Sequence, residues 1–212
     1  MTRRLCALAV AALLSACQLP PPAPSIVADR PSADSWRAVA RTADVERIDA
    51  IAADWEAGLA AARQAGLNGR LSAAGAALAP DSALPRASPP PGSYQCRLTR
   101  LGAGPGRRAL IRYPVYFCHI GVEGAWLSFA KQTGAERFDG YLFPDTDARL
   151  VFLGAAAAPG EGMAPGYGTN EARNLVGVFE RVAPMRYRLV IPSRAGARLD
   201  VIELAPITAP LE

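Results

Sequence analysis

The chain has 212 residues, half of them apolar, and its 23 Lys and Arg side chains against 19 Asp and Glu side chains give a net charge of +4. The apolar content is ample for one packed core and excludes a wholly disordered chain, and charges without a basic run exclude an electrostatic footprint for nucleic acid. A single His and four Cys exclude a His-rich metal centre and a zinc ribbon, and we expect no cofactor.

The amino terminus is typical of an export signal. Arg3 and Arg4 precede an unbroken apolar run over residues 5–14, and two small residues and Cys17 follow it. This run is too short for about 30 Å of hydrocarbon, which needs about 20 helical residues, so it suits the hydrophobic part of a secretion signal.

The junction at the end of this run resembles the lipobox of bacterial lipoproteins. By that resemblance, residues 1–16 are removed as a signal peptide, and Cys17 receives diacylglycerol on its thiol and an acyl chain on its new amine. At roughly 0.8 kcal/mol per buried methylene, three chains would anchor the protein in a membrane. Gln18, in place of an aspartate, favours the outer membrane, facing the periplasm. The alternative is an ordinary cleaved signal in which Cys17 is incidental.

A proline-rich stretch follows the cysteine. Four prolines between residues 19 and 25 favour an extended chain without internal hydrogen bonds. We therefore expect residues 17–32 to form a lipidated tether.

Residues 33–79 contain many alanines and no proline, which predicts a helical region. Apolar residues recur there at steps of three and four, the spacing of one helical face: Val45, Ile48, Ala52, Trp55, Leu59 and Ala62. Charged residues such as Asp44 fall on other faces, and glycine and asparagine at residues 66–69 predict the end of the helix. We interpret Trp36 and Trp55 as an apolar stripe that packs on the rest of the protein; a ligand-stacking pair is the alternative.

Residues 80–91 contain five prolines and are predicted to be a linker. From Gly92 the pattern changes to period two, in short segments rich in aromatic and β-branched residues and separated by turn signals. Eight strands are expected, near 92–98, 111–118, 125–131, 135–143, 149–153, 174–182, 186–191 and 199–204. Pro114 within the second strand predicts an edge or a bulge.

Eight short strands with mostly tight connections imply an antiparallel meander over residues 92–206, followed by a tail at 207–212. Such a sheet loses its exposed edges best by closing on itself. The predicted fold is therefore mainly β with an N-terminal helical region (α+β), its β part an eight-stranded, calycin-like closed barrel; a two-sheet sandwich is the alternative. One connection, residues 155–173, is long, and such loops are mobile flaps or solvated excursions.

Two cysteines remain once Cys6 leaves with the signal and Cys17 is lipidated. Cys96 and Cys118 fall on the first two predicted strands, and the envelope is oxidising, so we predict a disulfide between them. A redox pair or half of a metal site, with His119 next in sequence, is the alternative; no metal site is expected.

Charged residues within apolar strands are the candidate interior groups. Lys131, the chain's only lysine, shares a side of its strand with Phe129, and Glu180 is in register with Val178. If both face the barrel interior, each needs a partner, because an unpaired buried charge is costly. We expect an internal pair of a cation with a glutamate. Glu123, Glu136, Arg137 and Asp139 gather with Lys131 near one predicted hairpin, as a site or as a solvated face.

Several segments resemble an uncharacterised bacterial envelope family, domain of unknown function 4893. They include residues 92–98, 113–120, 129–140, 151–154 and 200–204, within a likeness covering about residues 36–206. This resemblance implies no known activity, ligand or catalytic residue. A looser likeness is to the periplasmic metalloprotease-inhibitor barrels, whose disulfide joins early strands as a bond between Cys96 and Cys118 would. In that family an extended amino-terminal segment enters the protease, whereas here a helical region intervenes.

Three function classes follow from the sequence. The first is a noncatalytic, membrane-anchored envelope lipoprotein whose barrel binds a protein or a small apolar ligand. The second is an inhibitor of periplasmic or secreted proteases or lysozymes. The third is an enzyme of unknown type; it has no catalytic candidates, because His119 is the only imidazole and no serine lies in a nucleophile elbow.

Overall fold

The computed structural model describes residues 35–102, 106, 108–196 and 198–208. Its strands form one closed antiparallel barrel in chain order, in which each strand pairs with the next and β8 pairs with β1. The strands are β1 (Gly92–Gly102), β2 (Leu110–Glu123), β3 (Trp126–Lys131), β4 (Phe138–Thr146), β5 (Arg149–Ala156), β6 (Asn174–Ala183), β7 (Arg186–Pro192) and β8 (Arg198–Pro206). The predicted eight-stranded closed barrel is confirmed, and the sandwich alternative is wrong.

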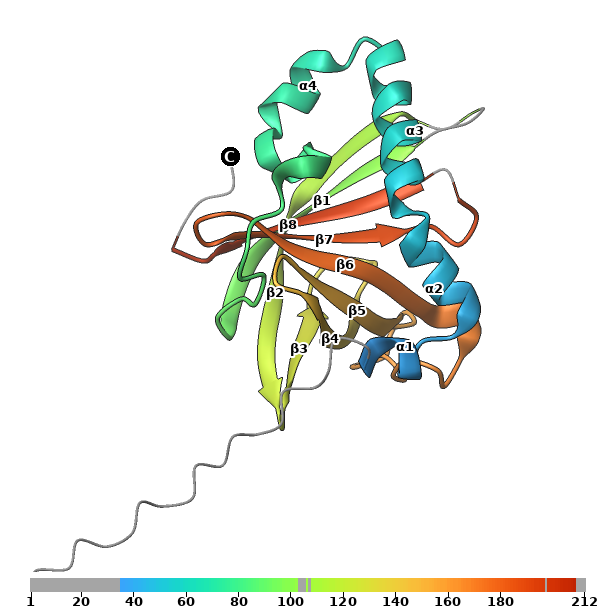
Figure 1. The fold of residues 1–212 in the computed structure, drawn as a ribbon, viewed down its shortest axis with the longest axis vertical. Helices are drawn as coiled ribbons and strands as arrows, with labels where there is room; N and C mark the ends of the chain where they lie inside the picture. The colour runs from blue at the N-terminus through green and yellow to red at the C-terminus, as the bar shows by residue number, and fades with distance from the viewer. Residues whose placement is uncertain (1–34, 103–105, 107, 197, 209–212) are drawn as a thin grey trace, which may run out of the picture.

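Short helices precede the barrel and lie against it (Figure 1). They are α1 (Ser35–Val39), α2 (Thr42–Asp49), α3 (Ile51–Gln64), α4 (Asn68–Ala73) and the 3₁₀ turns η1 (Gly75–Leu78) and η2 (Pro80–Ser82); a third turn, η3 (Glu171–Arg173), precedes β6. The continuous helix expected over residues 44–63 breaks at Ala50, so Ile51 is buried in place of Ala52. None of the helices described is both long and apolar enough to cross a bilayer.

The helical region packs on the outer face of the barrel. Trp36 and Trp55 are almost fully buried there, as predicted for a packing stripe, and the indole N–H of Trp36 donates to Asp145 at 2.8 Å. Apolar side chains of seven strands meet the helices in this outer core, among them Leu101, Leu110, Phe143, Val151, Val176, Val190 and Val201. Burial of one such side chain contributes about 1.5–3 kcal/mol, so the helices are part of one folded unit with the barrel.

Aromatic rings fill the middle of the barrel. Phe129 stacks on Phe138 with centroids 5.6 Å apart and meets Phe152 edge-on at 5.8 Å. Phe179 stacks on Tyr187 at 5.6 Å. The interior is therefore a packed core at this level and not a continuous channel.

The proline-rich segment at residues 84–91 lies across the end of the barrel where β1 begins. Ala87 is 2% exposed and donates its N–H to the carbonyl of Asp147 in the β4–β5 turn at 3.0 Å. The hydroxyl of Tyr94 donates to the carbonyl of Pro90 at 2.6 Å, and Arg181 donates to that of Pro85 at 2.9 Å. The expected linker is thus packed structure, because its carbonyls are anchored to the barrel end.

The predicted disulfide between Cys96 of β1 and Cys118 of β2 is present, with 5.9 Å between the two Cα atoms. Both cysteines are buried, and Cys118 lies across from Tyr94 of β1 and from Lys131 of β3. Just beyond Cys96 along β1, the register of β1 with β2 shifts: Arg97 faces Val115 but Thr99 faces Arg112. This bulge contains Pro114, as predicted, in a part of β2 that pairs only with β1.

Candidate functional site

The barrel has an opening at the end where β1 stops and β8 starts. A pocket of about 260 Å³ lies there, which we call the mouth pocket. Six charged residues line it: Arg100, Lys131, Glu136, Arg137, Arg198 and Asp200. Apolar side chains, among them Leu98, Phe138 and Ile202, form the rest of the wall. The pocket is thus charged at its rim and apolar where it meets the inner core.

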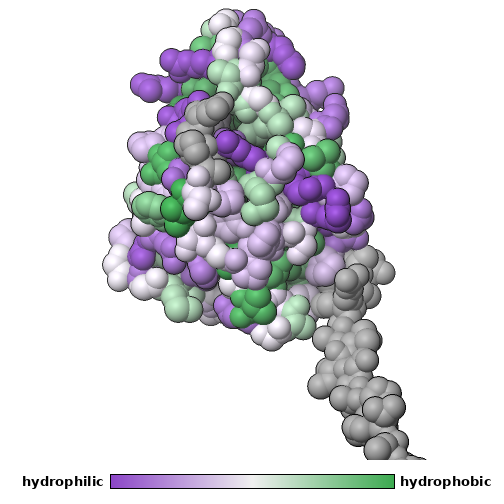
Figure 2. Space-filling view, turned by 90° about the vertical axis from the view of Figure 1, so that its left-hand side faces the viewer, coloured by the Kyte–Doolittle hydropathy of each residue, from purple (hydrophilic) through white to green (hydrophobic). Residues whose placement is uncertain are grey.

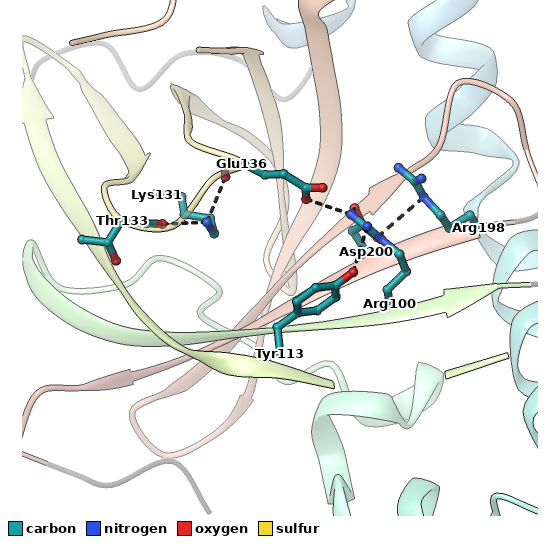
Figure 3. A network of polar contacts seen from close by, with 7 residues as sticks. All are labelled: Arg100, Tyr113, Lys131, Thr133, Glu136, Arg198 and Asp200. Carbon is teal, nitrogen blue, oxygen red and sulfur yellow. Dashed lines mark hydrogen bonds and ion pairs between the residues drawn. The ribbon is translucent and has the colours of Figure 1, made fainter. Parts of the chain in front are cut away.

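Arg100 is the best-anchored cation of the mouth pocket (Figure 3). Its Nε and Nη2 donate to the two carboxylate oxygens of Asp200 at 2.6 and 2.7 Å. Nη1 donates to the hydroxyl of Tyr113 at 3.1 Å, and Nη2 also donates to the carboxylate of Glu136 at 2.8 Å. The hydrogen bond with Asp200 outweighs the effect of burial and raises the pKa of Arg100, so this guanidinium is a fixed positive charge.

Lys131 lies on the inner side of β3, two residues beyond Phe129, and is only 3% exposed. Its ammonium donates to the carbonyls of Thr133 at 2.7 Å and Glu136 at 2.9 Å, as Figure 3 shows, and lies 4.2 Å from the ring centre of Tyr116. Burial lowers the pKa of Lys131, although the charge of Glu136 acts in the opposite direction.

Glu180, the other candidate interior charge, faces outward. It is in register with Val176 and Val178, as expected, but these valines belong to the outer core beneath the helices. Its carboxylate accepts from Nε of Arg188 at 2.7 Å. The cation–glutamate pair therefore exists between β6 and β7 under the helical region, and Lys131 has other partners. The expectation for Glu180 was wrong because both faces of β6 are buried.

Arg188 was not singled out in the sequence. Its side chain is 1% exposed, and its guanidinium donates to the carbonyls of Ala79 at 2.6 Å and Pro80 at 2.7 Å. The same group lies 5.3 Å from the ring centre of Trp55. An arginine within the apolar run of residues 187–191 was the available signal, because a charge there needs buried acceptors.

Charges of alternating sign form a row across five neighbouring strands on this outer face. In cross-strand register, from β5 through β8 to β1, they are Arg149, Glu180, Arg188, Glu203 and Arg97. Opposite charges placed directly across strands stabilise a sheet, and a shift of one residue would break every pair. The row therefore fixes the register of these five strands.

The long connection at residues 157–173 is held over the mouth and against the helices. Nη2 of Arg137 donates to the carbonyl of Glu161, and the carboxylate of Glu161 pairs with Arg173. This hydrogen bond with Arg173 lowers the pKa of Glu161 to about 2. Tyr167 donates its hydroxyl to Asp44 at the start of α2. None of the residues 157–173 is buried, as for a solvated loop, but side chains at both ends and in the middle attach it to the rest of the protein.

Asp44 joins the loop, helix α2 and strand β6. It was expected on an exposed face, but it is 4% exposed and also accepts from Arg47 and from Asn174. Burial acts to raise the pKa of Asp44, but the hydrogen bonds from Tyr167 and Arg47 outweigh it, so the net pKa lies below the usual value.

Other candidate positions carry less chemistry. His119 lies on the outer face of β2, with Nδ1 3.5 Å from the hydroxyl of exposed Ser93. Over the described ranges, no three His, Cys, Asp or Glu side chains gather as metal ligands would. The face shown in Figure 2 mixes hydrophilic and hydrophobic residues, with no broad apolar area. Cys17 lies outside the described residues.

These features define a class: a closed antiparallel barrel with a helical layer on its outer face, one end closed and a charged pocket at the other. The model of the family "domain of unknown function" 4893 matches residues 36–204, so the chain belongs to this family. No curated protein and no solved structure matches the chain.

Proposed function

We propose that the protein is a lipoprotein of the bacterial envelope, anchored through Cys17, whose barrel binds a small molecule at the mouth pocket without catalysing a reaction. The observation that carries the binding proposal is the asymmetry of the barrel: residues 84–91 cover one end, and the other end holds a pocket of about 260 Å³ with a buried lysine at its wall. A preformed concave site with convergent polar groups is the usual form of a ligand site.

Two features support the envelope location. The lipobox-like amino terminus is the sequence signal, and the Cys96–Cys118 disulfide is a bond that persists in oxidising compartments. The anchor is tested by Cys17→Ser in the native host. We expect the variant to leave the membrane fraction and to lack acyl chains by mass spectrometry; a variant that stays in that fraction like the wild type contradicts the anchor.

The binding function is tested on protein purified natively from the envelope. Organic extraction followed by mass spectrometry should release a small molecule from the wild type and much less from Ala135→Trp. Ala135 is exposed at the pocket rim, so the indole should block the pocket without disturbing the core. Equal release from both proteins, at equal thermal stability, contradicts binding at the mouth.

Inhibition of a protease or lysozyme is the second candidate from the sequence, and no contact in the described residues favours it over binding at the mouth. The purified protein can be assayed directly against metalloproteases and lysozymes. Stoichiometric inhibition that persists in Ala135→Trp would replace the present proposal.

A further inference from the structure

We infer that the ligand of the mouth pocket is a small carboxylate with a short apolar body, and that the carboxylate of Glu136 occupies the position on Arg100 that the carboxylate of the ligand takes. This inference rests on the proposed binding function and names the class of ligand.

The first argument is charge. The lining residues comprise four cations and two carboxylates, which leaves an excess of positive charge around the pocket. Asp200 and Glu136 both contact Arg100, so both negative charges lie on one side of the pocket. An anion is therefore the ligand that the rim attracts.

The second argument is the environment of Lys131. Its ammonium is buried and donates two hydrogen bonds, both to carbonyl oxygens. Within the described part of the chain, no Asp or Glu forms an ion pair with it. The charge of Glu136 acts on this ammonium without an ion pair, and a carboxylate in the pocket would supply a direct partner for the buried charge.

The third argument is the difference between the two carboxylates on Arg100. Asp200 is 15% exposed and binds through both of its oxygens, so it is a fixed part of the wall. The side chain of Glu136 is 62% exposed on a surface loop and meets Arg100 through one oxygen. An exposed ion pair contributes at most about 1 kcal/mol, so an incoming carboxylate can displace Glu136.

The contact between Lys131 and Glu136 uses the backbone carbonyl of Glu136 and not its carboxylate. A change of this side chain therefore keeps that hydrogen bond, and it removes one negative charge from beside both Arg100 and Lys131. Glu136→Gln thus tests whether this carboxylate competes with the ligand for the two cations.

Size and wall chemistry set the body of the ligand. At about 30 Å³ for each water in the liquid, a pocket of about 260 Å³ has room for roughly nine groups of that size. Leu98, Ile202 and Phe138 form its apolar wall, and the aromatic core closes the space beyond. Octanoate is a matched probe, and octanol, octylamine and octyl phosphate test the head group.

The test uses the full mature chain with Cys17→Ser, to keep it soluble, and calorimetric titration of each probe. Octanoate should bind at one site, and octanol and octylamine at least about tenfold more weakly, as loss of a charge-assisted hydrogen bond implies. Glu136→Gln should bind octanoate about threefold or more tightly than the wild type, and Lys131→Met about tenfold more weakly. Glu123→Gln, an exposed carboxylate at the opposite end of the barrel, is the matched control and should not change the affinity.

Lys131 is the only lysine of the chain, so wild-type protein labelled with isotope-enriched lysine gives a single lysine side-chain signal by NMR. The protein used for this measurement carries no tag that contains lysine. Octanoate should shift this signal and octanol should not, which tests the role of Lys131 even if Lys131→Met does not fold.

The outcomes separate the inference from the proposed function. If octanol binds as well as octanoate and Ala135→Trp abolishes both, the binding function stands and the carboxylate class is wrong. Tighter binding of octyl phosphate overturns the carboxylate class in favour of phosphate. If Glu136→Gln binds octanoate no better than the wild type, displacement of Glu136 is wrong. If no probe binds, the inference fails, and extraction from native protein still decides the proposed function.

Discussion

Single residues carry much of the specificity of this fold, and Arg188 is the clearest example. Its guanidinium joins Glu180 of β6 to the carbonyls of the segment that follows η1. The carbonyl of Ala79 also accepts from the N–H of Ser82 at 3.1 Å, so Arg188 adds a charged donor to the turn that ends the helical region. One buried arginine thus fixes where the chain leaves the helical layer.

Replacement of Arg188 should therefore be strongly destabilising. Arg188→Met keeps much of the side-chain volume but leaves Glu180 without its counterion, and we expect unfolding free energy to fall by about 3–5 kcal/mol. Urea denaturation followed by circular dichroism measures the change. Arg63→Met, an exposed arginine on the nearby α3, should change stability by less than about 0.5 kcal/mol; similar losses in the two variants would refute the role of Arg188.

The disulfide acts at the same scale. It closes a loop with a sequence separation of 22, for which chain entropy predicts about 3 kcal/mol of stabilisation. The double variant Cys96→Ala, Cys118→Ala should lose about that amount in urea denaturation. Unreduced mature protein with Cys17→Ser keeps Cys96 and Cys118 as its only cysteines and should show no reactive thiol. Two titratable thiols would contradict the bond.

Sequence patterns separate the two faces of a strand but do not say which face is inside. For β3 the rule works, because Phe129 is large, Ser128 is polar, and Lys131 follows the phenylalanine. For β6 it fails, since Val178 and Phe179 are both buried, one under the helices and one in the barrel. Arg100 and Asp200 are a hundred positions apart, so only the closed sheet brings them together.

At the scale of elements, the long loop is attached to helix α2 by the buried carboxylate of Asp44. Because the folded-state pKa of Asp44 is lowered, its contribution is fully present above the unfolded value of about 3.9 and is lost as the pH falls through the folded value. Asp44→Asn should lower unfolding free energy by about 1–3 kcal/mol at pH 7. The difference from wild type should shrink below about pH 4.

Unfolding free energy measured from pH 7 to pH 2.5 tests this prediction. Asp49→Asn is the control. Asp49 forms an ion pair with Arg37 at 3.6 Å, but both side chains are exposed, so the pair should contribute little to the unfolding free energy at any pH. If the wild-type and Asp44→Asn curves stay parallel through acid pH, the loop is not held by the ionised carboxylate.

The approach of β4 to β5 depends on a pair of glycines that the sequence pattern did not reveal. Gly140 lies directly opposite Gly154, and a Cβ on Gly140 would lie 2.4 Å from the Cα of Gly154. Gly140→Ala should therefore lower unfolding free energy by about 1–3 kcal/mol, measured in urea. Gly69→Ala, on α4 with no atom within 4 Å, should stabilise by up to about 1 kcal/mol. Equal effects at the two positions would contradict the close approach.

Elements were easier to predict than the contacts between them. Period two, prolines and turn residues located eight strands, and Gly66, with φ +74, ends α3 as predicted. The strand expected from residue 135 begins instead at Phe138, because residues 132–137 form the loop that contacts Lys131 and Arg100. Lys131, Glu136 and Arg137, which the sequence had grouped near one hairpin, do line the mouth pocket. The sequence did not bring Arg100, Arg198 and Asp200 to them, because those residues come from distant strands that only the closed sheet places there.

At the scale of the whole molecule, the helical region and the barrel share one core, although the composition suggested two parts joined by a linker. Trp55 and Leu59 of α3 belong to the same apolar core as Leu101 of β1 and Val201 of β8. Ala87 is buried against the closed end of the barrel. Separation of the two would expose the valines of the outer face. Contiguous apolar patches beyond a few hundred Å² favour association in water.

A chain that starts at residue 83 should therefore fail to form a soluble monomer, whereas one that starts at residue 33 should fold like the mature protein. The shorter chain keeps every strand and the closing segment, but Val178, Val190 and Val201 lose the helices that bury them. Size-exclusion chromatography and thermal circular dichroism distinguish the outcomes: aggregation, or a broad transition, is expected for the shorter chain. The two chains differ only in residues 33–82. A monomeric shorter chain with a sharp thermal transition would therefore show that the barrel folds by itself and that the helices are a separate, docked unit.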